Sequence, residues 1–213
     1  KRNVIGFDIN KERIDELKKG YDRTKENVKK NLLGINFIKL TTNIDDIAKA
    51  DVFIVTVPTP IDEFKKPNLS PIKKASLTVS EALKRRKLIH NDLSSNSIPI
   101  IIYESTVYPG TTQEICIPLI EKESGFFCDG KKTSNSFGCG YSPERINPGD
   151  KNKNITNIVK VTSGSSYEVS KWVNDLYSSF IKAGTHMVKD IKTAEAAKII
   201  ENTQPVSYTH LTL

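Results

Sequence analysis

The sequence predicts an α/β fold with a mostly parallel sheet, and three observations support this. Short apolar segments alternate with segments of helical periodicity along the chain, the pattern of strands joined by helices. Residues 52–57 form an uninterrupted apolar, β-branched run, which is typical of a strand buried on both faces of a parallel sheet. Polar loops rich in Pro and Gly, residues 104–111 and 142–150, each follow a strand-like segment. Loops at the carboxyl ends of parallel strands are where ligands bind, so a small-molecule enzyme is indicated.

The expected strands are short and recur along the chain. They are residues 4–7, 37–40, 52–57, 99–103, 137–141, 157–162 and 186–188. The first helix carries Ile14 and Leu17 on one face and stops at Gly20, and Asn43 caps a short second helix. Ser70-Pro71 begins a third, in which Ile72, Val79 and Leu83 belong to the buried stripe.

The second half of the chain contains two predicted capping boxes. Thr111 and Glu114 would begin a helix kinked at Pro118, and Ser165 and Glu168 would begin another. We expect that later helix to bury Val169, Trp172, Val173, Leu176 and Phe180. Residues 85–97 are basic and polar, which predicts a surface loop, and residues 124–136 read as an irregular insertion. The last helix would run from Asp190 through Asn202 and end before Pro205.

Composition bounds the class of protein. The 213 residues fit one large domain, or one domain and part of another, and 37% hydrophobic and 27% charged residues are ordinary for a soluble chain. No apolar run approaches the ~20 residues of a membrane-spanning helix. Residue 1 is Lys and no apolar leader follows it, so we expect a cytosolic protein that does not contact membranes. The 3 cysteines lack metal-ligand spacing, which predicts inert thiols and no metal site.

The net charge of +7 has two competing explanations. One is attraction of a phosphorylated small ligand, and the other is nucleic-acid binding. The basic residues are scattered, and no aromatic-rich strand resembles a base-stacking platform. We therefore favour surface charge together with anionic small ligands, and we expect no nucleic-acid partner.

The first candidate site residues follow strands. Asp8 ends a strand before a helix, where an acidic residue binds the adenosine ribose of a dinucleotide and repels a 2′-phosphate, and Arg13 lies within reach of it. The alternatives are a helix cap and a solvated charge. Thr59 and Thr106 follow later strands, and each hydroxyl either contacts ligand or belongs to a plain turn. Glu144 is either a partly buried proton-transfer group or half of a surface pair with Arg145.

Lys198 and Asn202 are four residues apart on a predicted helix, so they share one face. An ammonium and an amide directed at one point stabilise a developing oxyanion. From spacing alone, a solvent-exposed helix face is the simpler interpretation.

These segments together resemble the UDP-glucose/GDP-mannose dehydrogenase family of nucleotide-sugar 6-dehydrogenases. The matching segments occur in the family's order and are residues 6–10 with Arg13, 57–60, 104–111, 141–150 and 194–202. The sequences of residues 104–110 and 142–150 are similar to those of the branch that acts on UDP-N-acetylhexosamines in capsule and O-antigen synthesis. The nearest rival of the same class is a 6-phosphogluconate-type dehydrogenase, against which residues 142–145 argue.

The resemblance implies a Rossmann-like domain and an NAD-dependent, two-step oxidation of a UDP-sugar at C6. It implies that Asp8 and Arg13 bind the adenosine end of NAD, and that Thr59 and Thr106 line the cleft. Glu144 would assist proton transfer or position water beside the cofactor, and Lys198 and Asn202 would stabilise oxyanions. It also implies a homodimer for the full-length enzyme.

The resemblance also defines what does not match. The family's first strand with its Gly-rich loop, its catalytic cysteine and its UDP-binding domain have no counterpart, so we expect an inactive and weakly stable fragment. The expected parts are an incomplete NAD-binding domain at 1–188, the start of a central helix at 189–204, and a tail outside the family at 205–213. The alternative is a non-catalytic nucleotide-binding module.

Overall fold

The computed structural model describes residues 2–24, 38–61, 63, 66–89, 98–129, 135–144 and 155–210. Within those ranges, the structure describes only the backbone of residues 89, 155 and 202–210. Predictions that concern residues 37, 90–97, 130–134 and 145–150 also lie outside it.

The described strands form two sheets. A parallel pair consists of β1 (Val4–Phe7) and β2 (Ile38–Thr41). The larger sheet contains, in spatial order, β3 (Val52–Val55), β4 (Ile100–Tyr103), β5 (Gly138–Tyr141), β6 (Lys160–Gly164) and β7 (Thr185–Met187). Only the β5–β6 pairing is antiparallel among these described strands, which confirms the predicted α/β fold with a mostly parallel sheet.

The register of the larger sheet places three loops side by side. Val55 of β3 pairs with Tyr103 of β4, and Tyr103 pairs with Tyr141 of β5. Because these three strands are parallel and end in line, the residues that follow them meet at one edge of the sheet. That edge is where an open parallel sheet binds ligands.

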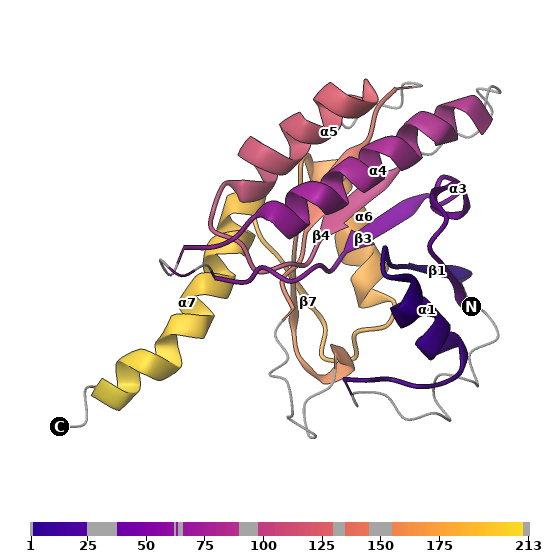
Figure 1. The fold of residues 1–213 in the computed structure, drawn as a ribbon. Coiled ribbons are helices and arrows are strands. Elements are labelled where there is room, and N and C mark those ends of the chain that lie inside the picture. The colour runs from indigo at the N-terminus through magenta and orange to yellow at the C-terminus, as the bar shows by residue number, and fades with distance from the viewer. Residues whose placement is uncertain are drawn as a thin grey trace.

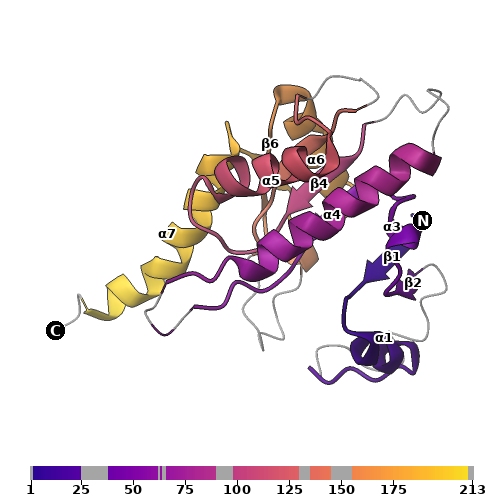
Figure 2. The same ribbon diagram turned by 45° about the horizontal axis from the view of Figure 1, so that its top comes forward.

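Helices cover both faces of the larger sheet. On one face α4 (Ser70–Ile89) and α5 (Ile117–Ser124) lie side by side, and their buried side chains pack with Ile101, Tyr103 and Cys139 (Figures 1 and 2). On the other face α6 (Tyr167–Ser178) buries Val169, Val173 and Tyr177 against Ile100 and Ile102. The alternating residues of β4 thus divide between two cores, as expected for a strand buried on both faces.

The remaining helices lie at the ends of the molecule. Helix α1 (Lys11–Lys18) follows β1, and the short α3 (Ile44–Ile47) follows β2, with the expected cap at Asn43. Helix α7 (Ile191–His210) begins against the large sheet and extends away from it on the side opposite α1 (Figure 1). The structure continues this helix through Pro205, so the predicted end before Pro205 is wrong. A proline removes only one hydrogen bond of the ladder, and the bonds on either side remain available.

The predicted surface loop at residues 85–97 is wrong for its first part. Helix α4 continues to Ile89, because Arg86 is buried and donates to Asp51 at 2.7 Å and to the Ala50 carbonyl at 2.9 Å. The basic character of these residues predicts solvent exposure, whereas the guanidinium of Arg86 anchors the helix to the start of β3.

Both predicted capping boxes are wrong in detail. Thr111 makes no capping bond, and its helix begins as a π-helical turn, η1 (Thr112–Cys116), ahead of α5 and Pro118. Helix α6 is capped one residue later than expected, by Ser166, which accepts from Val169 N. Trp172 and Phe180 are each 41% exposed, because the apolar stripe of α6 runs through Val169, Val173 and Tyr177 instead.

None of the described helices combines the length and apolar character needed to cross a bilayer.

Candidate active site

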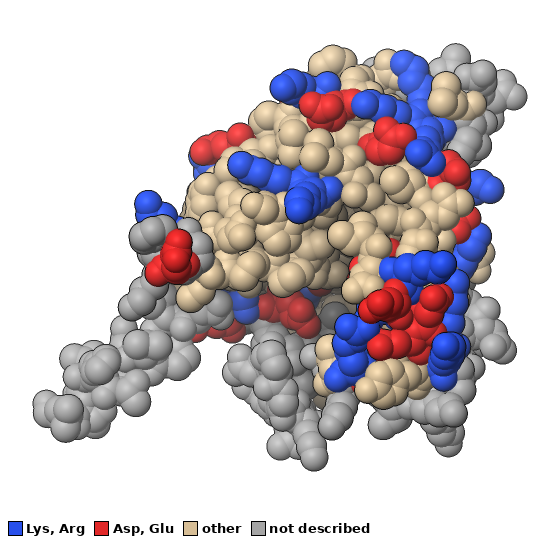
Figure 3. All heavy atoms as spheres, viewed as in Figure 1, with Lys and Arg blue, Asp and Glu red and all other residues tan. Residues whose placement is uncertain are grey.

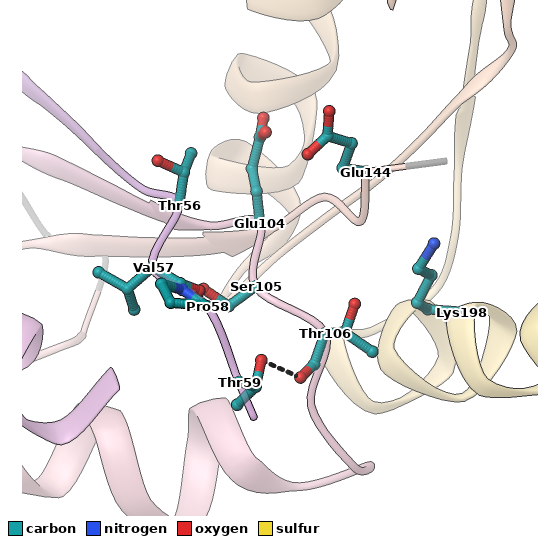
Figure 4. Close-up of a pocket in the computed structure, with 9 residues that line it drawn as sticks. All are labelled: Thr56, Val57, Pro58, Thr59, Glu104, Ser105, Thr106, Glu144 and Lys198. Atoms are coloured by element: carbon teal, nitrogen blue, oxygen red, sulfur yellow. Dashed lines mark hydrogen bonds between the residues drawn. The ribbon is translucent and has the colours of Figure 1, made fainter. Parts of the chain in front are cut away.

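A cavity of about 270 Å³ opens at the carboxyl ends of β3, β4 and β5. Its lining comes from three strand-end loops and from α7. The lining residues are Thr56, Val57, Pro58, Thr59, Glu104, Ser105, Thr106, Glu144 and Lys198. Four predicted site residues, Thr59, Thr106, Glu144 and Lys198, thus border the same space although the sequence separates them widely (Figure 4).

The loops after β3 and β4 are tied together by hydroxyl groups. Thr59 Oγ1 donates to the Thr106 carbonyl at 2.6 Å, and Ser105 Oγ donates to the Val57 carbonyl at 2.6 Å. The buried Tyr141 hydroxyl donates to the Ser105 carbonyl at 3.1 Å, and this bond ties the end of β5 to the loop after β4. The Thr59 hydroxyl therefore has a structural role, while the side chain of Thr106 faces the cavity (Figure 4).

Lys198 reaches the cavity from α7 and is half-buried (Figure 4). Lys198 therefore does not lie on a fully solvent-exposed helix face, because it borders the same cavity as Thr106 and Glu144. Asn202 lies one turn further along α7, and its side chain is outside the description.

Glu144 borders the cavity but its side chain is exposed, so the expectation of a partly buried carboxyl is wrong. It lies where the chain leaves β5. Its suggested partner Arg145 is outside the described residues.

Sequence reasoning missed a second carboxylate in this cavity, that of Glu104. Its Oε1 accepts a short hydrogen bond from the Tyr177 hydroxyl and lies 3.1 Å from the Nζ of Lys160. The side chains of Glu104 and Lys160 are 9% and 4% exposed, and Lys160 Nζ also lies 5.0 Å from the centre of the Tyr177 ring. Burial and the Glu104 charge raise the pKa of Tyr177. The signal in the sequence was that Glu104, like Asp8, directly follows an apolar strand.

A third carboxylate, Glu195 on α7, was also missed. It is fully buried and accepts from Gly110 N at 2.6 Å and from Thr112 N at 2.9 Å. Burial raises the pKa of Glu195, and the hydrogen bonds from Thr112 and Gly110 oppose that rise. No local pattern predicts these partners, which lie more than 80 residues away.

Asp8 and Arg13 lie outside the cavity, beside β1 and α1. Asp8 Oδ1 accepts from Asn10 N at 2.8 Å, and Asn10, not Asp8, is the N-cap of α1. Arg13 Nη2 donates to Asp22 at 2.7 Å, so it is not simply solvated. Its Nη1 is buried and has no hydrogen-bond partner among the described residues, so a donor is left over for an oxygen-rich ligand.

The cysteines are held as thiols. Burial raises the pKa of Cys116 and of Cys128 to about 11, and burial also raises that of Cys139. A protonated thiol is a poor nucleophile, which agrees with the interpretation of these residues as inert. In the part of the chain that the structure describes, no group of three or more His, Cys, Asp and Glu side chains could hold a metal ion.

On the face shown in Figure 3, Lys and Arg side chains are interspersed with Asp and Glu. They do not gather there into a basic stripe, so this face does not present the electrostatic pattern of a nucleic-acid binder.

The chain was compared with known proteins. The NAD binding domain of the UDP-glucose/GDP-mannose dehydrogenase family matches residues 1–181. UDP-N-acetyl-D-glucosamine 6-dehydrogenase of Pseudomonas aeruginosa is 50% identical over 96% of this chain, and Protein CapL of Staphylococcus aureus is 52% identical over 96%. The solved structure of a UDP-D-ManNAc dehydrogenase from Pyrococcus horikoshii covers 95% of the chain with a TM-score of 0.77 and 28% identity.

The matches cover only part of the relatives. The chain spans 44% of the length of each of the two curated relatives and 45% of the solved structure.

Proposed function

Because the chain belongs to the UDP-glucose/GDP-mannose dehydrogenase family and matches its NAD-binding domain, we propose that it is the NAD-binding part of a UDP-sugar 6-dehydrogenase. The proposed substrate is a UDP-N-acetylhexosamine, oxidised at the C6 alcohol to the carboxylate. The observation that carries the proposal is the convergence of Thr106, Glu144 and Lys198 on one cavity at the strand ends. The 50% identity to a relative named for UDP-N-acetyl-D-glucosamine supports this choice of sugar.

The cavity's side chains suit an oxidation that begins with loss of a hydroxyl proton. A carboxylate such as Glu144 accepts a proton directly or through a water molecule. The Lys198 ammonium would stabilise the negative charge that develops on the sugar oxygen, and we assign Asn202 to the same task. Thr106 would orient the sugar with its hydroxyl.

The described residues fit a bound NAD. Asp8 lies at the carboxyl end of β1, where a carboxylate holds ribose hydroxyls and disfavours a 2′-phosphate. Arg13 Nη1, which has no hydrogen-bond partner among the described residues, would donate to the oxygens of the adenosine half. NAD supplies the hydride acceptor, and Thr59 and Thr106 would border it.

We further propose that a strand with a Gly-rich loop completes the sheet between β1 and β3. Residues 1–188 would then be the NAD-binding domain, 189–204 the start of a central helix, and 205–213 a segment outside it. That β1–β2 and β3–β7 form separate sheets in the described residues supports this proposal. In the intact protein, the exposed apolar residues Ile199 and Ile200 of α7 would contribute to a homodimer.

The test is the stoichiometry of the intact gene product that contains this chain. We expect two molecules of NADH for each UDP-N-acetylglucosamine consumed, with the uronic acid as product. The chain alone should give no turnover, since none of its cysteines matches the family's catalytic one. One NADH per sugar, with aldehyde as the final product, would contradict the proposal.

A non-catalytic nucleotide-binding module is the second candidate, and the exposure of Glu144 favours it. An intact protein that binds NAD and UDP-sugar but forms no NADH would establish it.

A further inference from the structure

We propose that Glu195 is a positioning residue that sets the separation between Thr106 and Lys198. It would do so by clamping the loop after β4 onto the helix that carries Lys198. This inference rests on the proposed function, in which Thr106 and Lys198 act on the same substrate.

The clamp is a pair of charge-assisted hydrogen bonds in a fully buried place. Each carboxylate oxygen of Glu195 has its own backbone donor, with Gly110 N on Oε2 at 2.6 Å and Thr112 N on Oε1 at 2.9 Å. Hydrogen bonds to an ionised acceptor are shorter and stronger than neutral ones. A more exposed ion pair between Lys192 Nζ and Glu114 Oε1, at 2.7 Å, joins the same two elements.

The loop needs these bonds because it satisfies only part of its own backbone. Thr111 N donates to the Tyr108 carbonyl, whereas Gly110 N and Thr112 N donate to Glu195. Thr111 gives its hydroxyl to the Tyr108 carbonyl and makes no capping bond to η1. The first N–H groups of a helix have no partner within it, and the positive end of the helix dipole favours an anion there. Glu195 supplies that anion from a different helix.

Sequence spacing connects the clamp to the cavity. Glu195 and Lys198 are three residues apart on α7, so their side chains are neighbours on the helix surface. Gly110 lies four residues after Thr106 on the same loop. A shift of the loop relative to α7 therefore changes the distance between the Thr106 hydroxyl and the Lys198 ammonium.

The first experiment is Glu195→Gln in the intact protein. The isosteric amide keeps one acceptor oxygen but presents an N–H group to the other backbone donor, so the clamp loosens. Since a misplacement of about 1 Å costs about 100-fold in rate, we expect kcat to fall by about 10- to 100-fold. The KM for NAD should change by less than about 3-fold, because Asp8 and Arg13 lie elsewhere.

A double-mutant cycle separates positioning from general support of the fold. Added to Lys198→Ala, Glu195→Gln should reduce kcat by less than about 2-fold, since the group it positions is already gone. The full 10- to 100-fold loss in both backgrounds would overturn the proposal.

Hydrogen–deuterium exchange of the intact protein gives a readout that does not depend on activity. In Glu195→Gln, the peptide containing Gly110 and Thr112 should exchange about 10- to 100-fold faster, the factor expected for loss of a charge-assisted bond. Val173→Ala is the matched control, because it destabilises the opposite core and should raise exchange in α6 instead. Unchanged exchange at Gly110 and Thr112 would overturn the clamp. If the wild-type protein forms no NADH, the proposed function fails, while the exchange result still decides on the clamp.

Discussion

Charged side chains are positioned differently in two regions of the molecule, the cavity at the carboxyl ends of β3, β4 and β5 and the β1–β2 region. Around the cavity the partners are distant in sequence and buried, as in the contact of Glu104 with Lys160. Around β1 and β2 most partners are closer in sequence, as in the contact of Lys39 with Asp46, whose side chains are 62% and 19% exposed. The cavity therefore depends on the assembled fold, whereas the β1–β2 region is organised by local segments.

The largest expected effect compares these two ion pairs. Lys160→Met leaves the Glu104 carboxylate buried without its cation, which should cost about 3–5 kcal/mol in the free energy of unfolding. Lys39→Met is the matched control, and it should leave the urea midpoint unchanged, because Lys39 is 62% exposed. Equal destabilisation of the two variants would break the comparison.

The next effect concerns catalysis in the intact protein. Lys198→Ala should lower kcat by about 100- to 1000-fold, the usual loss when one donor to a developing oxyanion is removed. Lys171→Ala on α6, whose side chain is 62% exposed, should have no effect on NADH formation. A Lys198 variant with wild-type kcat would remove this residue from the mechanism.

A smaller effect comes from glycine in the two regions. A Cβ at Gly164 would lie 2.4 Å from the backbone nitrogen of Ser170, so Gly164→Ala must push α6 off the sheet and should cost about 1–3 kcal/mol. At Gly6 of β1 the obstacle is the tip of the Leu40 side chain, which can rotate away. In thermal denaturation, the Tm of Gly164→Ala should therefore be well below that of Gly6→Ala.

The smallest effect is the pH dependence of thiol alkylation. Because burial raises the pKa of Cys116 and Cys128 to about 11, both should stay protonated and react slowly with iodoacetamide at pH 8. Their rates should rise with pH toward 11, while the denatured chain should react readily already near pH 8.5, the ordinary pKa of a free thiol. Rapid labelling of the folded chain at pH 8 would contradict the burial of these thiols.

The sequence predicted those features of the fold that depend on residues close together in the chain. The strands, the Asn43 cap and the buried stripe of α4 follow from local patterns. The structure confirms them except for the strand expected at 157–162, which begins only at Lys160, after a 3-10 turn at Ile155–Asn157. The capping box at Thr111 failed because the partner of the Thr112 N–H lies on α7, and the box at Ser165 was displaced by one residue to Ser166. A spacing rule cannot detect a carboxylate that arrives from 83 or 85 residues away.

The cavity was predictable only in part, for the same reason. Thr106, Glu144 and Lys198 were predicted through strand ends and family motifs. The sheet register explains why the loops of Thr106 and Glu144 meet, while Lys198 reaches the same cavity from α7. Glu195 was not predicted, since it looks like an ordinary acidic residue until its buried partners are known, and the only signal for Glu104 was its position directly after an apolar strand. The exposure of Glu144 likewise depends on what packs over the end of β5.

A crystal structure of the intact protein with NAD and UDP-N-acetylglucosamine would decide whether the proposed oxidation of a UDP-sugar takes place in this cavity. The account predicts that the sugar C6 hydroxyl lies among Thr106, Glu144 and Lys198, at about 3–3.5 Å from the group that reacts with it. A complex in which both ligands are bound and the sugar C6 lies outside this cavity would contradict the account.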